Sequence, residues 1–131
     1  MSSPRIEHVN VTVRDPHRTS RLMTDLFGWP IRWQGPARDG GLSIHVGTSE
    51  QYIALYTGGG ATYTDEDFAM GRPLNHIGVE VDDLETTEAR VVAAGLRPFS
   101  HGDYEPGRRF YFLDPDGIEY EVVSYASRTS R

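Results

Sequence analysis

Two histidines and one glutamate hold related positions in the sequence, and all three are residue types that bind divalent metal ions. Residues 7–15 (EHVNVTVRD) are echoed by residues 75–83 (NHIGVEVDD), so His8 and His76 occupy the same place in an internal repeat. Glu121 lies in the last strand-like segment of the second copy. Imidazole nitrogens and carboxylate oxygens are frequent metal ligands in proteins. The pattern therefore favours a metal site on His8, His76 and Glu121.

The alternation of apolar and polar residues predicts that these three side chains avoid the apolar faces of their strands. Neighbouring residues of a β-strand point to opposite faces. His8 lies opposite the valines within residues 9–13, which we expect to face the helices, and His76 lies opposite the apolar residues within 77–81. Glu121 likewise alternates with two apolar neighbours. A polar face carrying all three groups is the expected result.

Ala54 completes this set of equivalent positions. It sits in the segment YIALY at the point where Glu121 sits in EYEVV. His8, Ala54, His76 and Glu121 are therefore equivalent at the level of the repeat, and three of the four are metal-ligand types.

Both copies have the pattern of a βαβββ unit, which predicts an α+β fold. Helices are expected to begin after Asp15 and Asp83, which are good N-cap residues, and to end near Gly28 and Gly95. The strands expected after the helices cover residues 30–34, 42–46 and 52–56 in the first copy and residues 97–100, 109–113 and 118–125 in the second. The sequence DPDG at residues 114–117 is a strong turn signal.

The chain of 131 residues has the size of one domain. We expect a single domain over residues 1–131, with a first module at 4–57, a connector at 58–73 and a second module at 74–126. The connector is rich in glycine and then in acidic residues. It is therefore expected to be a plain linker.

Composition excludes several classes of protein. The net charge of −6 argues against a nucleic-acid partner, because phosphate-backbone binding requires a basic face. No apolar run approaches the roughly 20 residues that cross a bilayer, and no signal segment is expected, so the chain is predicted to be cytoplasmic and to have no membrane partner. There is no cysteine, so a metal site must use histidine and carboxylate ligands.

The sequence resembles the vicinal oxygen chelate superfamily, which includes glyoxalase I, extradiol dioxygenases, fosfomycin-resistance enzymes and bleomycin-binding proteins. The resemblance rests on IEHV at residues 6–9, LNHIGV at 74–79, and FYFLDPDG at 110–117 leading to Glu121. It implies two βαβββ modules that form a cupped, barrel-like mixed sheet with the helices outside. It also implies a divalent metal, a small-molecule substrate and, commonly, a homodimer.

Within this resemblance, two histidines and a carboxylate form a facial triad with open coordination positions. Such a triad favours Fe(II) or Mn(II), with Zn(II) or Ni(II) as alternatives. A substrate with two neighbouring oxygens can chelate the ion, which then acts as a Lewis acid.

The likeness to individual members is mixed. Glyoxalase I carries an acidic fourth ligand where this sequence has Ala54, which argues against lactoylglutathione lyase activity. The fosfomycin-resistance enzymes share the run at residues 110–117, but their phosphonate-binding residues align with His101 and Glu105, and a glutamate would repel a phosphonate. The first functional hypothesis is a ring-cleaving, extradiol-type dioxygenase. The alternatives are a glyoxalase-like lyase or isomerase and a metal-free binding protein of the bleomycin-resistance kind.

Tyr111 and His101 are the candidate catalytic residues. Tyr111 could donate a hydrogen bond to a metal-bound oxygen, and His101, expected in a loop, is a candidate general base. His45 is expected to be structural, and Arg108 and Arg109 either bind an acidic substrate or flank a turn.

Overall fold

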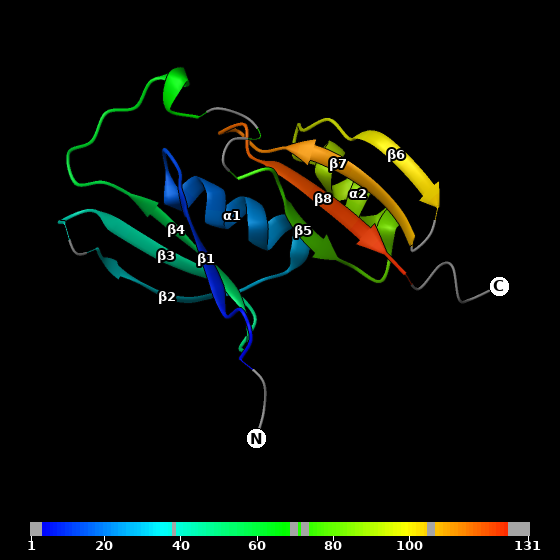
Figure 1. Ribbon diagram of the computed structural model, residues 1–131, viewed down its shortest axis with the longest axis horizontal. Coiled ribbons are helices and arrows are strands. Elements are labelled where there is room, and N and C mark those ends of the chain that lie inside the picture. The colour runs from blue at the N-terminus through cyan, green and yellow to red at the C-terminus, as the bar shows by residue number, and fades with distance from the viewer. Residues whose placement is uncertain (1–3, 38, 69–70, 72–73, 105–106, 126–131) are drawn as a thin grey trace. The chain divides into compact units, whose positions relative to one another are not determined.

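The computed structural model describes residues 4–37, 39–68, 71, 74–104 and 107–125, and it divides the chain into two compact units, residues 1–63 and 64–131. The first unit contains β1 (His8–Thr12), α1 (Pro16–Phe27), β2 (Ile31–Pro36), β3 (Leu42–Gly47) and β4 (Tyr52–Thr57). The second contains a short 3-10 turn, η1 (Asp65–Asp67), then β5 (Ile77–Glu80), α2 (Leu84–Ala93), β6 (Phe99–Tyr104), β7 (Gly107–Leu113) and β8 (Glu119–Ser124). The predicted α+β class with two βαβββ modules is confirmed (Figure 1).

The two units have the same sheet topology. The strand order is β1-β4-β3-β2 in the first unit and β5-β8-β7-β6 in the second. In each unit the first strand pairs in parallel with the last, and the remaining pairs are antiparallel. The internal repeat seen in the sequence is therefore a repeat of strand order and direction as well.

The ends of both helices follow the local sequence signals. Asp15 accepts hydrogen bonds from the backbone N–H groups of His17 and Arg18, and Asp83 caps α2 in the same way through Thr86. Gly28 ends α1 with φ of 74°, a left-handed conformation that suits glycine. Gly95 follows α2 with φ of 85°. The predicted helix boundaries are confirmed within a residue or two.

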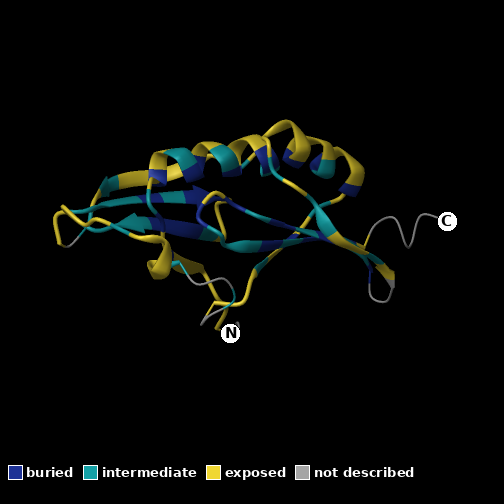
Figure 2. Ribbon diagram, turned by 90° about the horizontal axis from the view of Figure 1, so that it is seen from above, coloured by how far each residue is buried: buried dark blue, intermediate teal, exposed yellow. Residues whose placement is uncertain are grey.

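Each helix covers one face of its own sheet, and the core of each unit lies between that helix and that sheet (Figure 2). The large side chains that are fully buried include Met23, Leu26, Ile44 and Leu55 in the first unit, and Val91, Phe110, Phe112 and Tyr120 in the second. Val11 and Val13 lie in the core as predicted, whereas Val9 is 41% exposed. Because β1 is an edge strand and α1 contacts mainly β3 and β4, the helix leaves this end of β1 uncovered.

The bounds of strand β6 differ from the predicted bounds. It spans Phe99–Tyr104 rather than residues 97–100, so His101 lies in a strand and not in a loop. The pairing of β6 with β7 shifts between Phe99 and Gly102, and Ser100 takes a positive φ of 55° at this irregularity. A β-bulge extends the strand past a segment whose glycine and aspartate indicated a turn.

The DPDG turn between β7 and β8 is built as the sequence predicts. Asp114 Oδ1 accepts hydrogen bonds at 2.9 Å from the backbone N–H groups of Asp116 and Ile118. Gly117 takes the left-handed conformation, with φ of 81°. Among the described residues, no helix is long and apolar enough to cross a membrane.

Candidate metal centre

Glu121 lies in the middle of β8, where its carboxylate is held by two cationic or polar partners from neighbouring segments. In the sheet it is opposite Gly78 of β5 and Tyr111 of β7. Its Oε1 lies 3.0 Å from His76 Nε2, and its Oε2 lies 2.6 Å from Arg109 Nη1. The side chains of Glu121 and Arg109 are only 13% and 12% exposed. Two of the predicted ligands, His76 and Glu121, are therefore brought together.

The other ring nitrogen of His76 is held by the residue before it. His76 Nδ1 lies 2.8 Å from Asn75 Oδ1, which is within hydrogen-bond distance. A neutral ring that donates through Nδ1 has its lone pair on Nε2, the atom that faces the carboxylate of Glu121. The 3.0 Å between Nε2 and Oε1 fits either a proton shared by the two groups or a cation bound by both of them.

His8 in the first unit also has its Nδ1 next to a polar side-chain atom of the preceding residue. Its Nδ1 lies 3.0 Å from Glu7 Oε1, and its ring stacks on Tyr52 at a centroid distance of 4.8 Å. The side chain of the preceding residue thus contacts Nδ1 of His8, as Asn75 contacts Nδ1 of His76. Hydrogen bonds of this kind commonly orient metal-binding histidines and raise their basicity.

The sheet register confirms that Ala54 and Glu121 are equivalent. Ala54 is opposite Asn10 of β1 and His45 of β3, as Glu121 is opposite Gly78 of β5 and Tyr111 of β7. A methyl group therefore stands in the first unit where the second unit has a carboxylate.

Among the residues that the structure describes, no three His, Asp or Glu side chains form a ready-made cluster. His8 lies in the first unit, and His76 and Glu121 lie in the second.

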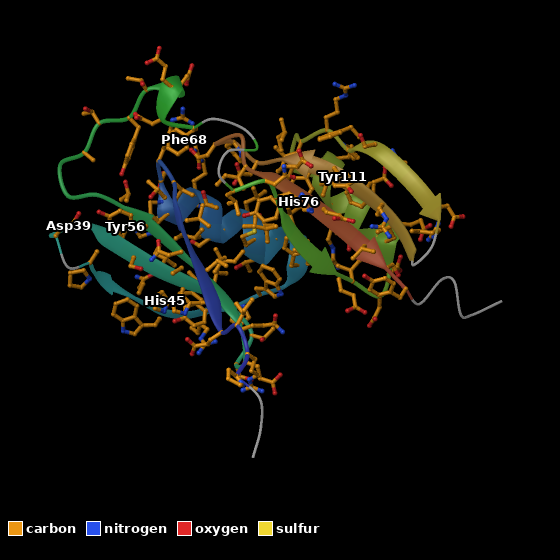
Figure 3. All side chains as sticks on the ribbon, in the orientation of Figure 1. Asp39, His45, Tyr56, Phe68, His76 and Tyr111 are labelled. Atoms are coloured by element: carbon orange, nitrogen blue, oxygen red, sulfur yellow. The ribbon has the colours of Figure 1, made fainter. Side chains whose placement is uncertain are left out.

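The two candidate catalytic residues lie on different faces of the second sheet. Tyr111 contacts His76 edge to face at 5.9 Å between ring centroids and shares the face of Glu121 (Figure 3). His101 instead pairs with Glu88 of α2 at 2.6 Å and stacks on the buried Phe110. The bulge in β6 directs His101 to the helix side, so the structure does not bring it to Glu121.

Sequence reasoning missed an aromatic ladder on the first sheet, which we define as His8, Tyr52, His45 and Trp33. Successive ring centroids along it are 4.8, 4.5 and 4.9 Å apart. His45 is labelled in Figure 3, and it holds the position in β3 that Tyr111 holds in β7. Aligning these two strands of the repeat would have placed His45 on the sheet face that is equivalent to the face of Tyr111 and Glu121.

Sequence reasoning also missed the partner of Arg109. Arg109 is opposite Val123 in the sheet and reaches diagonally to Glu121, two residues back along β8. Its position two residues before Tyr111 already indicates the same face of the strand.

The pKa of His45 is lowered in the folded protein, and this predicts that stability depends on pH. Burial, followed by the charges of His8 and Arg32, lowers the pKa of His45 below its usual value of 6.5. The folded state thus binds this proton less readily than the unfolded state, so the stabilising contribution exists above pH 6.5 and is lost as the pH falls through the lowered pKa.

Replacing His45 with phenylalanine keeps a ring in the ladder and removes this titration. In thermal unfolding with a chelator present, the wild type is expected to lose more stability than His45→Phe between about pH 7.5 and about pH 5.5. Parallel losses in the two proteins would contradict the effect.

Comparison with known proteins identifies the family. The model of the Glyoxalase/Bleomycin resistance protein/Dioxygenase superfamily matches residues 5–122, and the chain belongs to this superfamily. No curated protein matches the sequence.

Solved structures share the fold at low sequence identity. A glyoxylase/bleomycin resistance protein/dioxygenase domain from Frankia sp. EAN1pec is 24% identical, with a TM-score of 0.76 over 94% of this chain and 98% of its own. The trypanothione-dependent glyoxalase I of Leishmania major is 19% identical, with a TM-score of 0.77 over 96% of this chain and 90% of its own. The fosfomycin resistance protein FosX of Listeria monocytogenes, solved with Mn(II) and sulfate, is 17% identical, with a TM-score of 0.72 over 94% and 93% of the two chains.

Proposed function

We propose that this protein is a metal-dependent enzyme that holds a divalent ion on His8, His76 and Glu121 and acts on a small oxygen-chelating substrate. One observation carries the proposal: each histidine has its Nδ1 bound by the side chain of the preceding residue, and His76 Nε2 faces a carboxylate at 3.0 Å. The donor set of two imidazoles and one carboxylate suits Fe(II) or Mn(II), with Zn(II) or Ni(II) as alternatives. The presence of Mn(II) in the FosX structure is compatible with this choice.

A divalent ion bound here supplies Lewis acidity and open positions for two substrate oxygens. Glu7 and Asn75 keep the two imidazole rings in the tautomer that presents Nε2. Tyr111 is the proposed catalytic residue, because its ring contacts His76 and its phenol can donate a hydrogen bond to a substrate oxygen. His101 is left out of this proposal, since it is paired with Glu88 on the helix side of the sheet.

A ring-cleaving dioxygenase is the reaction we propose first. The aromatic ladder supports it, because the ladder runs from a proposed metal ligand to Trp33, whose ring can stack on a planar aromatic substrate. Trp33, at the far end of the ladder, is 48% exposed. A catechol has both the planar ring and the two neighbouring oxygens that such a site requires.

The experiment that tests this reaction supplies Fe(II) anaerobically and then measures dioxygen uptake with a panel of catechols. We expect uptake together with a ring-opened product, and loss of both in His76→Ala. Formation of lactoylglutathione from methylglyoxal and glutathione, without dioxygen uptake, would overturn the dioxygenase proposal in favour of a glyoxalase-like lyase or isomerase. That alternative lacks an acidic group at Ala54, and no other proposed residue replaces it.

The alternative outside enzymes is a metal-free protein that binds aromatic small molecules. The aromatic ladder favours it, because stacking on the half-exposed ring of Trp33 requires no metal. Catechol binding that survives chelator treatment, in a protein that takes up no metal, would support this function and exclude the metal-dependent one.

We also propose a homodimer in the cytoplasm. Each four-stranded sheet has two edge strands, β1 and β2 in the first unit and β5 and β6 in the second, and the unpaired backbone groups of an edge strand can pair with a second chain.

A further inference from the structure

Arg109 forms the best-protected ion pair to the candidate metal ligands. Its Nη1 lies 2.6 Å from Glu121 Oε2, and its Nη2 lies 3.4 Å from the backbone carbonyl oxygen of Gly107. Both members of the pair are nearly buried, with 12% and 13% of their side chains exposed. The carboxylate proposed as a metal ligand thus already has a cation of the chain beside it.

A guanidinium is a permanent charge in this setting. It does not release its proton at any pH at which the protein is folded, so it cannot become neutral when a second cation arrives. A divalent ion on Oε1 of Glu121 and the guanidinium on Oε2 would share one carboxylate, and the two cations repel each other. This repulsion opposes metal binding at the same time as the pair holds the carboxylate in place.

The internal repeat offers a natural comparison for this pair. Ser43 is opposite Tyr56 in the first unit, at the position that Arg109 holds opposite Val123 in the second. Where the second unit has Glu121 the first has Ala54, and where the second has Arg109 the first has Ser43. The arginine is present in the unit that has the carboxylate and absent from the unit that lacks it.

We propose that Arg109 is a positioning residue that acts as the built-in counter-cation of Glu121: it fixes the ligand carboxylate in the metal-free protein and lowers the affinity of the site for a divalent ion. This inference rests on the proposed function, because it takes Glu121 as a metal ligand. In this proposal the divalent ion and the guanidinium of Arg109 compete for the carboxylate of Glu121.

The test compares Mn(II) affinity in the wild type, Arg109→Gln and Arg109→Lys by isothermal titration. Arg109→Gln is expected to bind Mn(II) at least about tenfold more tightly, because the repulsion is removed. Arg109→Lys keeps the charge and is expected to stay within a few-fold of the wild type. The matched control is Arg108→Gln, which removes the same charge from the neighbouring residue, whose guanidinium pairs with Glu85 of α2 instead.

Two outcomes separate the failure of this inference from the failure of the proposed function. If the wild type binds Mn(II) and Arg109→Gln binds it equally or more weakly, Arg109 is not an opposing charge and the inference is wrong. If neither protein binds Mn(II), Fe(II), Zn(II) or Ni(II), the metal centre itself is wrong, and the inference falls with it.

A second measurement covers the case in which Arg109→Gln does not fold. The double variant Arg109→Ser with Glu121→Ala reproduces the Ser43 and Ala54 arrangement of the first unit. In thermal unfolding without metal it is expected to be more stable than Glu121→Ala alone, which leaves Arg109 without its carboxylate. A double variant less stable than Glu121→Ala alone would show that the arginine stabilises the fold independently of Glu121.

Discussion

Phe112→Ala is expected to lower the free energy of unfolding by about 3–5 kcal/mol, which is a large share of the stability of a small protein. The ring of Phe112 has no exposed surface and stacks on Tyr120 with centroids 5.2 Å apart and planes inclined by 7°. Removing the ring eliminates this stacking and leaves a cavity between β7, β8 and α2. Urea unfolding followed by circular dichroism measures the effect.

An apolar residue on the surface provides the control for this change. Val92 of α2 is 57% exposed, and Val92→Ala is expected to change stability by no more than about 0.5 kcal/mol. A loss from Phe112→Ala that is similarly small would mean that the second unit is not packed around this ring.

Glu121→Ala is expected to abolish divalent-metal binding and also to destabilise the metal-free protein by on the order of 3 kcal/mol. The stability loss arises because the substitution removes a carboxylate that lies 2.6 Å from the nearly buried guanidinium of Arg109. Isothermal titration and urea unfolding measure the two effects.

Glu119→Ala is the matched control on the same strand. Glu119 lies two residues before Glu121 on the same face of β8, opposite Leu113, and it is partly exposed. It is expected to keep metal binding and to lose little stability. Equal effects of the two substitutions would mean that the loss at Glu121 reflects a general change in strand charge, which would contradict a specific role for this carboxylate.

The internal repeat was the sequence feature that made most of the fold predictable. Two copies of one strand pattern, two aspartate caps and the DPDG turn determined the order of elements and the ends of both helices. The equivalence of Ala54 and Glu121 also follows from the repeat, because equivalent strands pair in the same register.

Three features depend on strand pairing or helix placement in ways that the sequence pattern does not specify, so they were not predictable. The bulge near Ser100 moves His101 to the helix side, and regular alternation cannot anticipate the extra residue. The contact of Arg109 with Glu121 is a diagonal cross-strand pair, so it appears only once the register of β7 and β8 is known. The exposure of Val9 likewise depends on which strands the helix covers.

Metal stoichiometry tests the central claim most directly. Protein incubated with Mn(II) or Fe(II), passed through a desalting column and analysed for metal is expected to retain about one ion per chain. His8→Ala, His76→Ala and Glu121→Ala should each retain almost none, whereas His17→Ala, which alters an exposed histidine of α1, should match the wild type. A wild type that retains no metal after exposure to Fe(II), Mn(II), Zn(II) or Ni(II), or that binds it equally well without these three residues, would contradict the account.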